Sequence, residues 1–378
     1  MKKIEMVDLC SHYRRFKPEI DLAVNEVMEA AAFINGQAVG QFAGELADYL
    51  QTPHVIPCAN GTDALQAALM ALDLKPGDEV ITPGFSFISS VEVIVLLGLK
   101  PVLTDINPYT FNLDPDLVRQ TITPFTKAII PVHLFGQPAD MDPILDLAAA
   151  HNLQVIEDNA QSLGSCHISH DNIRRRTGTL GAIGTTSFFP TKPLACYGDG
   201  GALMTADPGL AEKIRMIVNH GSRIKYHNEL IGMNSRLDTL QAAILRINLR
   251  HLDEAIERRQ QVADYYDRHL GGHPAIRIPT RSIYGTHVFH QYTITILEGN
   301  RDRIRSGLQE AGIPSMVYYP VPLSLQKPLA IFGYREGDLP ITEDLCRRVL
   351  SLPIHTEMTE DQLDHICRTL LTLLDHEA

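Results

Sequence analysis

The sequence predicts an α/β protein whose mostly parallel sheet is covered by helices on both faces, followed by a smaller α+β region. Strand-like and helix-like stretches alternate between about residues 78 and 158, as in successive βα units. Past about residue 270 this alternation is lost. A chain of 378 residues is long enough for two domains, and we expect a large one over residues 1–250 and a small one over 251–378.

Composition argues against several functional classes. The net charge of −12 is the opposite of what nucleic-acid-binding domains usually carry. The longest strongly apolar run, 93–99, is far shorter than the ~20 residues that cross a bilayer, and the N-terminus lacks the apolar run of a signal peptide. Six scattered cysteines without a C-x-x-C pair favour reduced thiols, so we expect a cytoplasmic protein with no metal site. From the charge and the short apolar runs we expect no nucleic-acid partner and no membrane contact.

The N-terminal region is predicted to form amphipathic helices over about 17–32 and 38–50. An alanine- and leucine-rich helix follows the stretch ANGTDAL at 59–65. Its start at Gly61 and Thr62 would present free backbone N–H groups and a positive dipole end, which suits a phosphate. Ordinary N-capping by Asn60 or Thr62 accounts for the same residues, and both interpretations stay open.

The βα units come next in the chain. Strands are predicted over 78–82, 101–105, 128–133 and 153–158, and helices over 89–97, 115–120 and 141–152. The last strand ends at Asp158, and ligands of open α/β sheets bind at such strand ends. An acid in this position is also a common helix cap, so the residue alone does not decide between the two roles.

The stretch TTSFFPTKPLACYGDGGALM at 185–204 predicts a strand, a tight turn, a glycine-rich loop and a second strand. Pro190 and Pro193 bracket Lys192 and stiffen the turn that carries it. A lysine held in this way is a candidate for the Schiff-base lysine of a pyridoxal phosphate (PLP) enzyme, and the alternative is a solvated turn lysine. Upstream, 167–181 is predicted to be a hairpin whose basic run, Arg174–Arg176, is either a solvated tip or a site for an anionic partner.

The rest of the chain predicts a helix over 211–219 and another that opens at MNSRLDTLQAA, from 233, and continues past residue 250. A strand over 288–297, a helix over 301–312 and a strand over 315–323 follow. The C-terminal helix begins after Thr359, with Gln362 at capping-box spacing.

Several motifs in order resemble the DegT/DnrJ/EryC1/StrS sugar aminotransferases over nearly the whole chain. They are ANGTDAL (59–65), ITPGFSF (81–87), IEDNAQS (156–162), SFFPTKPLACYGDGGA (187–202), MNSRLDTLQAA (233–243) and YYPVPLSLQ (318–326). The resemblance implies the PLP-dependent transferase fold type I, which is aspartate aminotransferase-like, and PLP as the cofactor.

The resemblance also implies roles for individual residues. Lys192 would bind PLP covalently and then act as the acid–base group, while Asp158 would hold the pyridine nitrogen. The remaining residues would contact cofactor or substrate: Phe87 and Gln161 at the ring; Gly61, Thr62, Ser187 and, across a homodimer with shared active sites, Asn234 at the phosphate; Arg236, Tyr318, Tyr319 and Gln326 at the substrate.

In detail the chain looks most similar to the branch that aminates UDP-2-acetamido-2-deoxy-3-oxo-glucuronate for cell-surface polysaccharide or lipopolysaccharide. L-glutamate would donate the amine and leave as 2-oxoglutarate. Ser324 departs from the family pattern, because many members have histidine there, which puts any contact made by that histidine in doubt. The alternatives are a carbon-4 keto-sugar aminotransferase and, in a different class, a PLP-binding regulatory protein.

Overall fold

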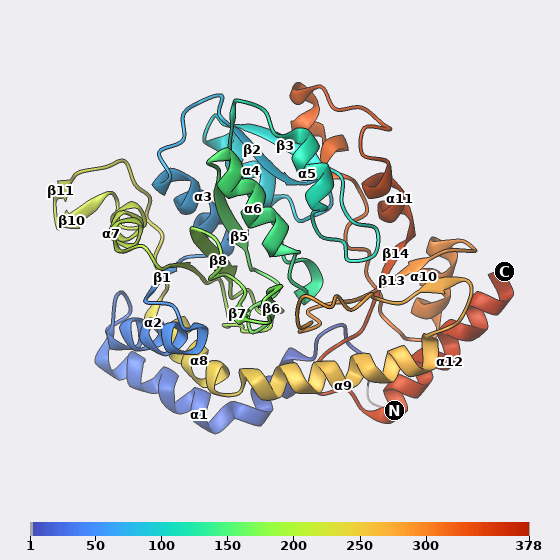
Figure 1. The fold of residues 1–378 in the computed structure, drawn as a ribbon. Helices are drawn as coiled ribbons and strands as arrows, with labels where there is room; N and C mark the ends of the chain where they lie inside the picture. Colours follow the sequence, from blue (N-terminus) through green and yellow to red (C-terminus); the bar gives the residue numbers. More distant parts are fainter. Residues whose placement is uncertain (1–2, 378) are drawn as a thin grey trace.

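The computed structural model describes residues 3–377 and is built around two sheets (Figure 1). The larger sheet has seven strands in the order β1-β9-β8-β5-β4-β2-β3, and its four neighbouring pairs from β8 to β3 are parallel. Its strands are β1 (His54–Cys58), β2 (Glu79–Pro83), β3 (Lys100–Thr104), β4 (Thr126–Ile129), β5 (Gln154–Asp158), β8 (Ile183–Ser187) and β9 (Gly201–Thr205).

Helices cover both faces of the large sheet, as predicted. Neighbouring residues of one strand point to opposite faces, so each strand contributes to two cores. Val80, Ala128 and Ile156 pack with α3 (Gly61–Ala71), α4 (Ser89–Leu96) and α7 (Pro208–Ile217). Their neighbours Ile81, Ile129 and Val155 pack with α5 (Pro115–Thr121) and α6 (Met141–His151).

Three further helices flank the β1–β9 end of the sheet: α1 (Leu9–Ala30), α2 (Gln37–Leu50) and α8 (Thr239–Arg250). Phe42 and Leu46 of α2 and Leu245 of α8 share a core with Val55 of β1 and Met204 of β9. Two short hairpins complete this part of the chain. They are β6 (Cys166–Ile168) with β7 (Arg174–Arg176), as predicted, and β10 (Ser222–Ile224) with β11 (His227–Asn228), which was not predicted.

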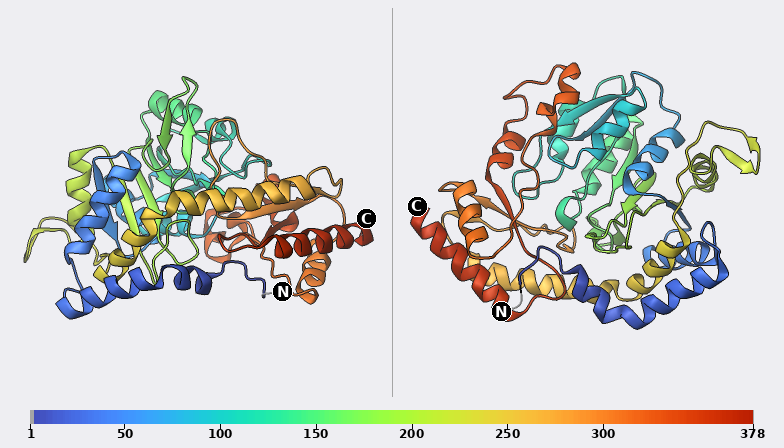
Figure 2. Two further views of the ribbon diagram at one scale, coloured as in Figure 1. Left: turned by 90° about the horizontal axis from the view of Figure 1, so that it is seen from below. Right: turned by 180° about the vertical axis from the view of Figure 1, so that it is seen from behind.

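The smaller sheet is antiparallel and consists of β12 (Ile276–Arg277), β13 (Tyr292–Ile296) and β14 (Val349–Leu352). It packs with α9 (Leu252–Leu270), α10 (Arg301–Glu310) and α12 (Glu360–Glu377) around a second core. Ile4 joins this core, and Lys3 lies beside α12, where the Gln362 side chain donates to the Lys3 carbonyl oxygen at 3.4 Å; Figure 2 shows this side of the molecule in two further views. The α+β character of this region is confirmed, whereas the domain boundary at residue 250 stays a prediction.

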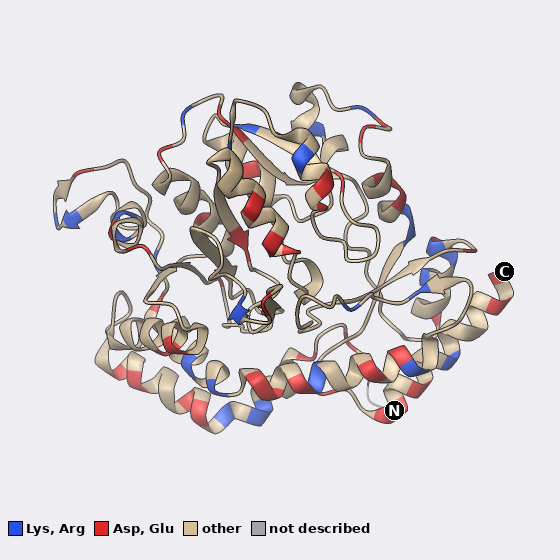
Figure 3. Cartoon of the chain, viewed as in Figure 1, with Lys and Arg blue, Asp and Glu red and all other residues tan. Residues whose placement is uncertain are grey.

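Acidic residues recur along the outer helices α1, α9 and α12, and basic residues lie on the same helices in smaller numbers (Figure 3). Several form ion pairs one helical turn apart, such as Arg258 with Glu254 at 3.2 Å and Arg368 with Asp364 at 2.7 Å. Such exposed pairs stabilise a helix only slightly. No helix within residues 3–377 is long and apolar enough to cross a membrane.

Several predicted boundaries were wrong. The helix expected from residue 233 begins at Thr239, because the amides of Met233 and Ser235 donate to the carbonyl oxygens of Ile217 and Val218 at 2.7 and 3.0 Å. These bonds hold 233–235 in an extended conformation. The strand expected over 315–323 is reduced to a single bridge between Met316 and Ser351.

One other element starts earlier than predicted, and one was not predicted at all. Helix α1 begins at Leu9, eight residues earlier than predicted, because the Asp8 side chain caps it by accepting from the amide of Ser11. Strand β1 was not predicted; it pairs antiparallel with β9 and forms the edge of the large sheet.

Candidate active site

A cavity of about 650 Å³ opens at the carboxyl ends of β5 and β8. Nine of the predicted site residues line it: Gly61, Thr62, Phe87, Asp158, Gln161, Ser187, Lys192, Tyr318 and Tyr319. Residues far apart in the sequence therefore converge where parallel sheets usually bind ligands. Within residues 3–377, no three His, Cys, Asp or Glu side chains are arranged to hold a metal ion.

Lys192 sits in a rigid turn at the cavity wall. Its amide donates to the carbonyl oxygen of Phe189 at 2.8 Å, closing a four-residue turn with Pro190 in the second position. Just after the turn, the carbonyl oxygen of Ala195 accepts a hydrogen bond from the side chain of Asn248 in α8 at 2.7 Å. Burial lowers the pKa of Lys192 to about 8, although the charge of Asp158 opposes this. The amine is thus partly unprotonated near neutral pH and can act as a nucleophile.

Asp158 is the last residue of β5, and only 5% of its surface is exposed. One carboxylate oxygen accepts from the amide of Ala160 at 3.1 Å. Burial raises the pKa of Asp158, while the Ala160 bond and the Lys192 charge act in the opposite direction. A buried carboxylate with a single hydrogen bond from the part of the chain that the structure describes is suited to hold a cationic group of a ligand.

Glu157, the preceding residue, is a buried carboxylate with a structural role. Burial raises the pKa of Glu157, but His133 and backbone amides outweigh it, and the pKa lies below its usual value. Its oxygens accept from the amides of Gly178, Leu180 and Gly181 at 2.6–2.8 Å.

His133 completes this buried pair. Its Nε2 lies 2.9 Å from Glu157, and its Nδ1 accepts from the amide of Ala139 at 3.0 Å. The Nδ1 bond requires the proton of a neutral ring to be on Nε2, which donates to Glu157. The pair fixes the loops on either side of β5, a role that the sequence did not reveal for either residue.

At one flank of the cavity, the start of α3 lies against the end of β8. Asn60 caps the helix by accepting from the amide of Asp63 at 2.8 Å, so the capping interpretation is correct for Asn60. The amides of Gly61 and Thr62 have no intrahelical partners, and both residues line the cavity. A Cβ atom on Gly61 would lie 2.8 Å from that of Ser187, so only glycine permits this approach. Capping and anion binding are therefore compatible here.

The opposite flank is formed by Phe135, Gln161 and Tyr319. The Gln161 oxygen accepts from the amide of Phe135 at 2.8 Å, and its nitrogen contacts the hydroxyl of Tyr319 at 3.1 Å. The Phe87 ring centroid is 6.3 Å from that of Tyr319, and 54% of the Phe87 surface is exposed. An aromatic face is thus open to stack on a planar ligand.

His290 and Gln291 also line the cavity, although no sequence motif indicated a role for either residue. Both lie within the strand predicted over 288–297, whereas β13 begins only at Tyr292. His290 is 5% exposed, and its Nδ1 has no hydrogen-bond partner among the described residues. Burial and the charges of Lys192 and Arg259 hold the pKa of His290 well below its usual value, so the ring is neutral.

Three predicted residues lie outside the lining of the cavity. Asn234 is exposed and bridges Asn219, and it lies before α8 instead of within it. Arg236 is half-buried and forms no ion pair with the described residues. Gln326 directly precedes the short helix η3 (Lys327–Phe332) and makes no side-chain capping bond to it. The roles assigned to these three residues stay predictions.

The structure shows the contacts of two features whose roles the sequence left open. Arg176 of the basic run donates to the carbonyl oxygen of Gly164 at 2.6 Å and lies 4.4 Å above the ring of Tyr49. Its neighbours Arg174 and Arg175 are exposed. Ser324 is 2% exposed, and its hydroxyl has no partner among the described residues.

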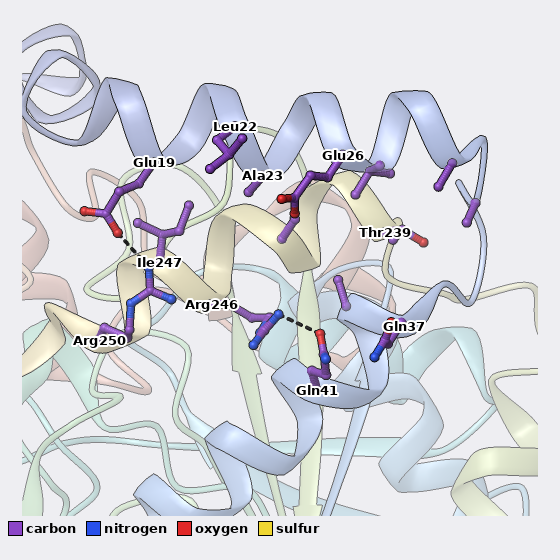
Figure 4. Close-up of a pocket in the computed structure, with 15 residues that line it drawn as sticks. Glu19, Leu22, Ala23, Glu26, Gln37, Gln41, Thr239, Arg246, Ile247 and Arg250 are labelled. Atoms are coloured by element: carbon purple, nitrogen blue, oxygen red, sulfur yellow. Dashed lines mark hydrogen bonds and ion pairs between the residues drawn. The ribbon is translucent and has the colours of Figure 1, made fainter.

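A second hollow, of about 470 Å³, lies between α1, α2 and α8 and contains none of the predicted site residues (Figure 4). Its two arginines are already paired: Arg246 with Glu45 at 2.6 Å and Arg250 with Glu19 at 2.7 Å. It therefore offers no competing arrangement of chemical groups.

Several known proteins are similar in sequence to this chain. A relative described as "Pleiotropic regulatory protein" from Geobacillus stearothermophilus is 44% identical over 99% of this chain and 100% of its own length. The UDP-2-acetamido-2-deoxy-3-oxo-D-glucuronate aminotransferase of Pseudomonas aeruginosa is 44% identical over 97% of this chain and 99% of its own. The dTDP-3-amino-3,4,6-trideoxy-alpha-D-glucose transaminase of Streptomyces venezuelae is 41% identical over 95% of this chain and 93% of its own length.

Two solved structures have the same fold. DesV of S. venezuelae, in complex with a ketimine intermediate, superposes with a TM-score of 0.95 at 39% identity and 99% coverage of both chains. NtdA of Bacillus subtilis, with the cofactor PMP bound, gives a TM-score of 0.87 at 34% identity over 95% of this chain and 82% of its own. The family profile matches residues 15–371. This chain belongs to the DegT/DnrJ/EryC1/StrS aminotransferase family.

Proposed function

We propose that this protein is a PLP-dependent aminotransferase that transfers the amino group of L-glutamate to a UDP-linked keto-sugar. The observation that carries the proposal is the convergence of Lys192, Asp158 and the start of α3 on one cavity. A partly unprotonated amine, a buried carboxylate and an anion-binding helix end are the three groups that PLP requires. When bound, PLP supplies an electron sink for the bonds around the amine carbon.

The residues of this chain would divide the work around that cofactor. Lys192 would bind it covalently and, once released, carry the proton between the two carbons of the transamination. Asp158 would keep the ring nitrogen protonated, and Gly61, Thr62 and Ser187 would hold the phosphate. Phe87 would cover one face of the ring and exclude water from it.

The substrate is inferred to be UDP-2-acetamido-2-deoxy-3-oxo-glucuronate, in the biosynthesis of cell-surface polysaccharide or lipopolysaccharide. Support comes from the 44% identity to the P. aeruginosa enzyme. Among the described residues, Lys192 is the only lysine or arginine that lines the cavity, so an acidic sugar diphosphate needs cations from elsewhere. Arg236, which has no ion-pair partner among residues 3–377, would supply one such cation from a second subunit. Asn234 would supply a phosphate contact in the same way. Tyr318 and Gln326 would contact the sugar.

The decisive experiment separates the two half-reactions. The PLP-loaded protein is mixed with L-glutamate, and 2-oxoglutarate release is measured; the aminated protein is then offered UDP- and dTDP-linked 3-oxo and 4-oxo sugars, with products identified by mass spectrometry. We expect turnover with the UDP-3-oxo-uronate. Amination of a 4-oxo sugar instead would favour the carbon-4 alternative.

A regulatory role is the second candidate, and the similarity to the "Pleiotropic regulatory protein" favours it. Such a protein could bind PLP without catalysing transamination. The first half-reaction distinguishes the two, because a pure regulator would release no 2-oxoglutarate from glutamate.

A further inference from the structure

A small cavity, which we call the Arg259 cavity, adjoins the turn that carries Lys192. It has a volume of about 60 Å³ and lies between the start of α1, the junction of α8 and α9, and the segment 355–356. Pro190, Lys192 and Pro193 form part of its wall. A space of this size holds a few water molecules or one small ion, and it is too small for a sugar or a nucleotide.

The guanidinium of Arg259 lines this cavity and carries a buried charge. Arg259 is 5% exposed, and its Nη1 donates to the carbonyl oxygens of Phe289 and Ile354 at 3.2 and 3.0 Å. Burial lowers the pKa of Arg259 to about 10, so the group stays charged near neutral pH. It forms no ion pair within residues 3–377. A buried charge without a counter-ion is strongly unfavourable, so proteins normally pair it.

The acidic side chains of the cavity are engaged elsewhere. Glu254 lines it but pairs with Arg15 at 2.5 Å and with Arg258 at 3.2 Å. Asp8 also lines it, and its side chain caps the start of α1. Neither carboxylate contacts Arg259, so the chain as described leaves this positive charge uncompensated.

Two further side chains determine what the cavity can bind. The Nε2 of His12 lies 3.2 Å from the side-chain oxygen of Asn248. Burial lowers the pKa of His12, and the charge of Arg259 acts in the same direction, so the ring is neutral near pH 7. The hydroxyl of Tyr197 has no hydrogen-bond partner among the described residues. Burial raises the pKa of Tyr197 to about 12, so this hydroxyl keeps its proton and can donate it.

We propose that the Arg259 cavity binds a small monovalent inorganic anion of the size of chloride, held by the Arg259 guanidinium and the Tyr197 hydroxyl. A guanidinium is weakly hydrated and well suited to ion pairs in poorly solvated places. The anion would supply the counter-charge that the surrounding side chains lack. It would also join α9 to the lysine turn, because both line the cavity. The inference does not rest on the proposed function.

Chloride-35 NMR of the full-length, PLP-loaded protein tests the site directly. Gluconate keeps the ionic strength constant, and bound chloride in exchange with free chloride broadens the chloride signal. We expect broadening that bromide reverses and that glutamate, which is too large for the cavity, does not reverse. The unfolding temperature should also rise with chloride at constant ionic strength, because an ion that binds only the folded state stabilises it.

Variants of two adjacent arginines assign the binding to this cavity. Arg259→Met keeps the length of the side chain but removes its charge, and should weaken chloride binding about tenfold or more. Arg259→Lys keeps the charge and should bind chloride more tightly than Arg259→Met. The matched control is Arg258→Met, which should bind chloride as the wild type does, because Arg258 lies outside the lining and pairs with Glu254. Circular dichroism verifies the folding of each variant.

Tyr197→Phe keeps the test decisive if Arg259→Met does not fold, because it removes only the hydroxyl. We expect it to weaken chloride binding about fivefold, the equivalent of one neutral hydrogen bond. Chloride broadening that is absent from the wild type, equal in Arg259→Met, or unchanged in Tyr197→Phe would overturn the inference. So would an equal loss in Arg258→Met. A protein that binds chloride here but releases no 2-oxoglutarate from glutamate would overturn only the proposed function.

Discussion

At the scale of single residues, the site depends on two groups of opposite charge placed in a poorly solvated cavity. Burial makes the charged form of each less favourable, so the pKa of Lys192 falls to about 8 and the pKa of Asp158 rises. Each charge partly relieves the other. A cationic ring nitrogen would compensate Asp158, and covalent attachment would consume the amine of Lys192.

The pH dependence of cofactor attachment follows from the lowered pKa. Only the neutral amine attacks an aldehyde, and for Lys192 it dominates above about pH 8 instead of above the ordinary 10.5. Near neutral pH this increases the reactive fraction by roughly two orders of magnitude. We expect the rate at which cofactor-free protein takes up PLP to rise with pH to a plateau with a midpoint near 8. Stopped-flow absorbance measures it; a rate still rising steeply past pH 10 would contradict the assignment.

Replacing Asp158 tests the other of these two groups. Asp158→Asn keeps the shape but cannot balance a protonated ring nitrogen. We expect PLP still to bind, and transamination to slow on the order of a thousandfold. The matched variant is Glu157→Gln, which should act mainly on stability, because that carboxylate contacts His133 and loop amides. Near-normal turnover by Asp158→Asn would mean that a different group pairs with the ring.

Prolines around a lysine and an acid at a strand end are local signals, so the sequence pointed to Lys192 and Asp158, and the structure places both at the cavity. No local signal showed that the preceding Glu157 faces His133 and loop amides instead, because the strand pleat decides this. Tyr319 was expected in the site, but its bond to Gln161 joins positions 158 residues apart. Contacts between residues so far apart in the sequence leave no pattern in either local stretch.

At the scale of elements, the close approach of α3 to β8 shapes the anion-binding flank. The βα units, the helix after Gly61 and both flanking strands of the lysine turn were predictable from residue composition and from the alternation of strand-like and helix-like stretches. The start of α8 was not, because the bonds that keep Met233 and Ser235 extended come from the end of α7. Tertiary contacts there override a locally plausible helix.

Gly61→Ala tests that approach. The new Cβ would lie 2.8 Å from the Cβ of Ser187, so α3 must move away from β8. We expect the affinity for PLP to fall about tenfold or more, the equivalent of one lost hydrogen bond to a charged group. Gly44→Ala in α2 is the control, since nothing lies within 4 Å of its added Cβ. Fluorescence titration compares the two, and equal affinities would remove Gly61 from the site.

At the scale of the whole molecule, one chain supplies a cavity that contains only part of the predicted site. Asn234 and Arg236 lie outside it, on the segment between α7 and α8. Both would act on the site of a second subunit if the protein is a homodimer.

Subunit complementation tests this sharing. Lys192→Ala and Asn234→Ala are each expected to be inactive or severely impaired. A mixed dimer would contain one site with both residues intact, so mixing the two variants should restore part of the activity. Mass spectrometry of labelled chains verifies subunit exchange. No recovery after verified exchange would mean that Asn234 serves its own subunit.

The most direct measurement of the central claim is reductive trapping of the cofactor. The protein is incubated with PLP, reduced with borohydride, digested and mapped by mass spectrometry. We expect the added pyridoxyl mass only on the peptide that contains Lys192. In Lys192→Ala, we expect no added mass on the corresponding peptide. Stoichiometric labelling of a different lysine, or unchanged transamination by Lys192→Ala, would contradict the account.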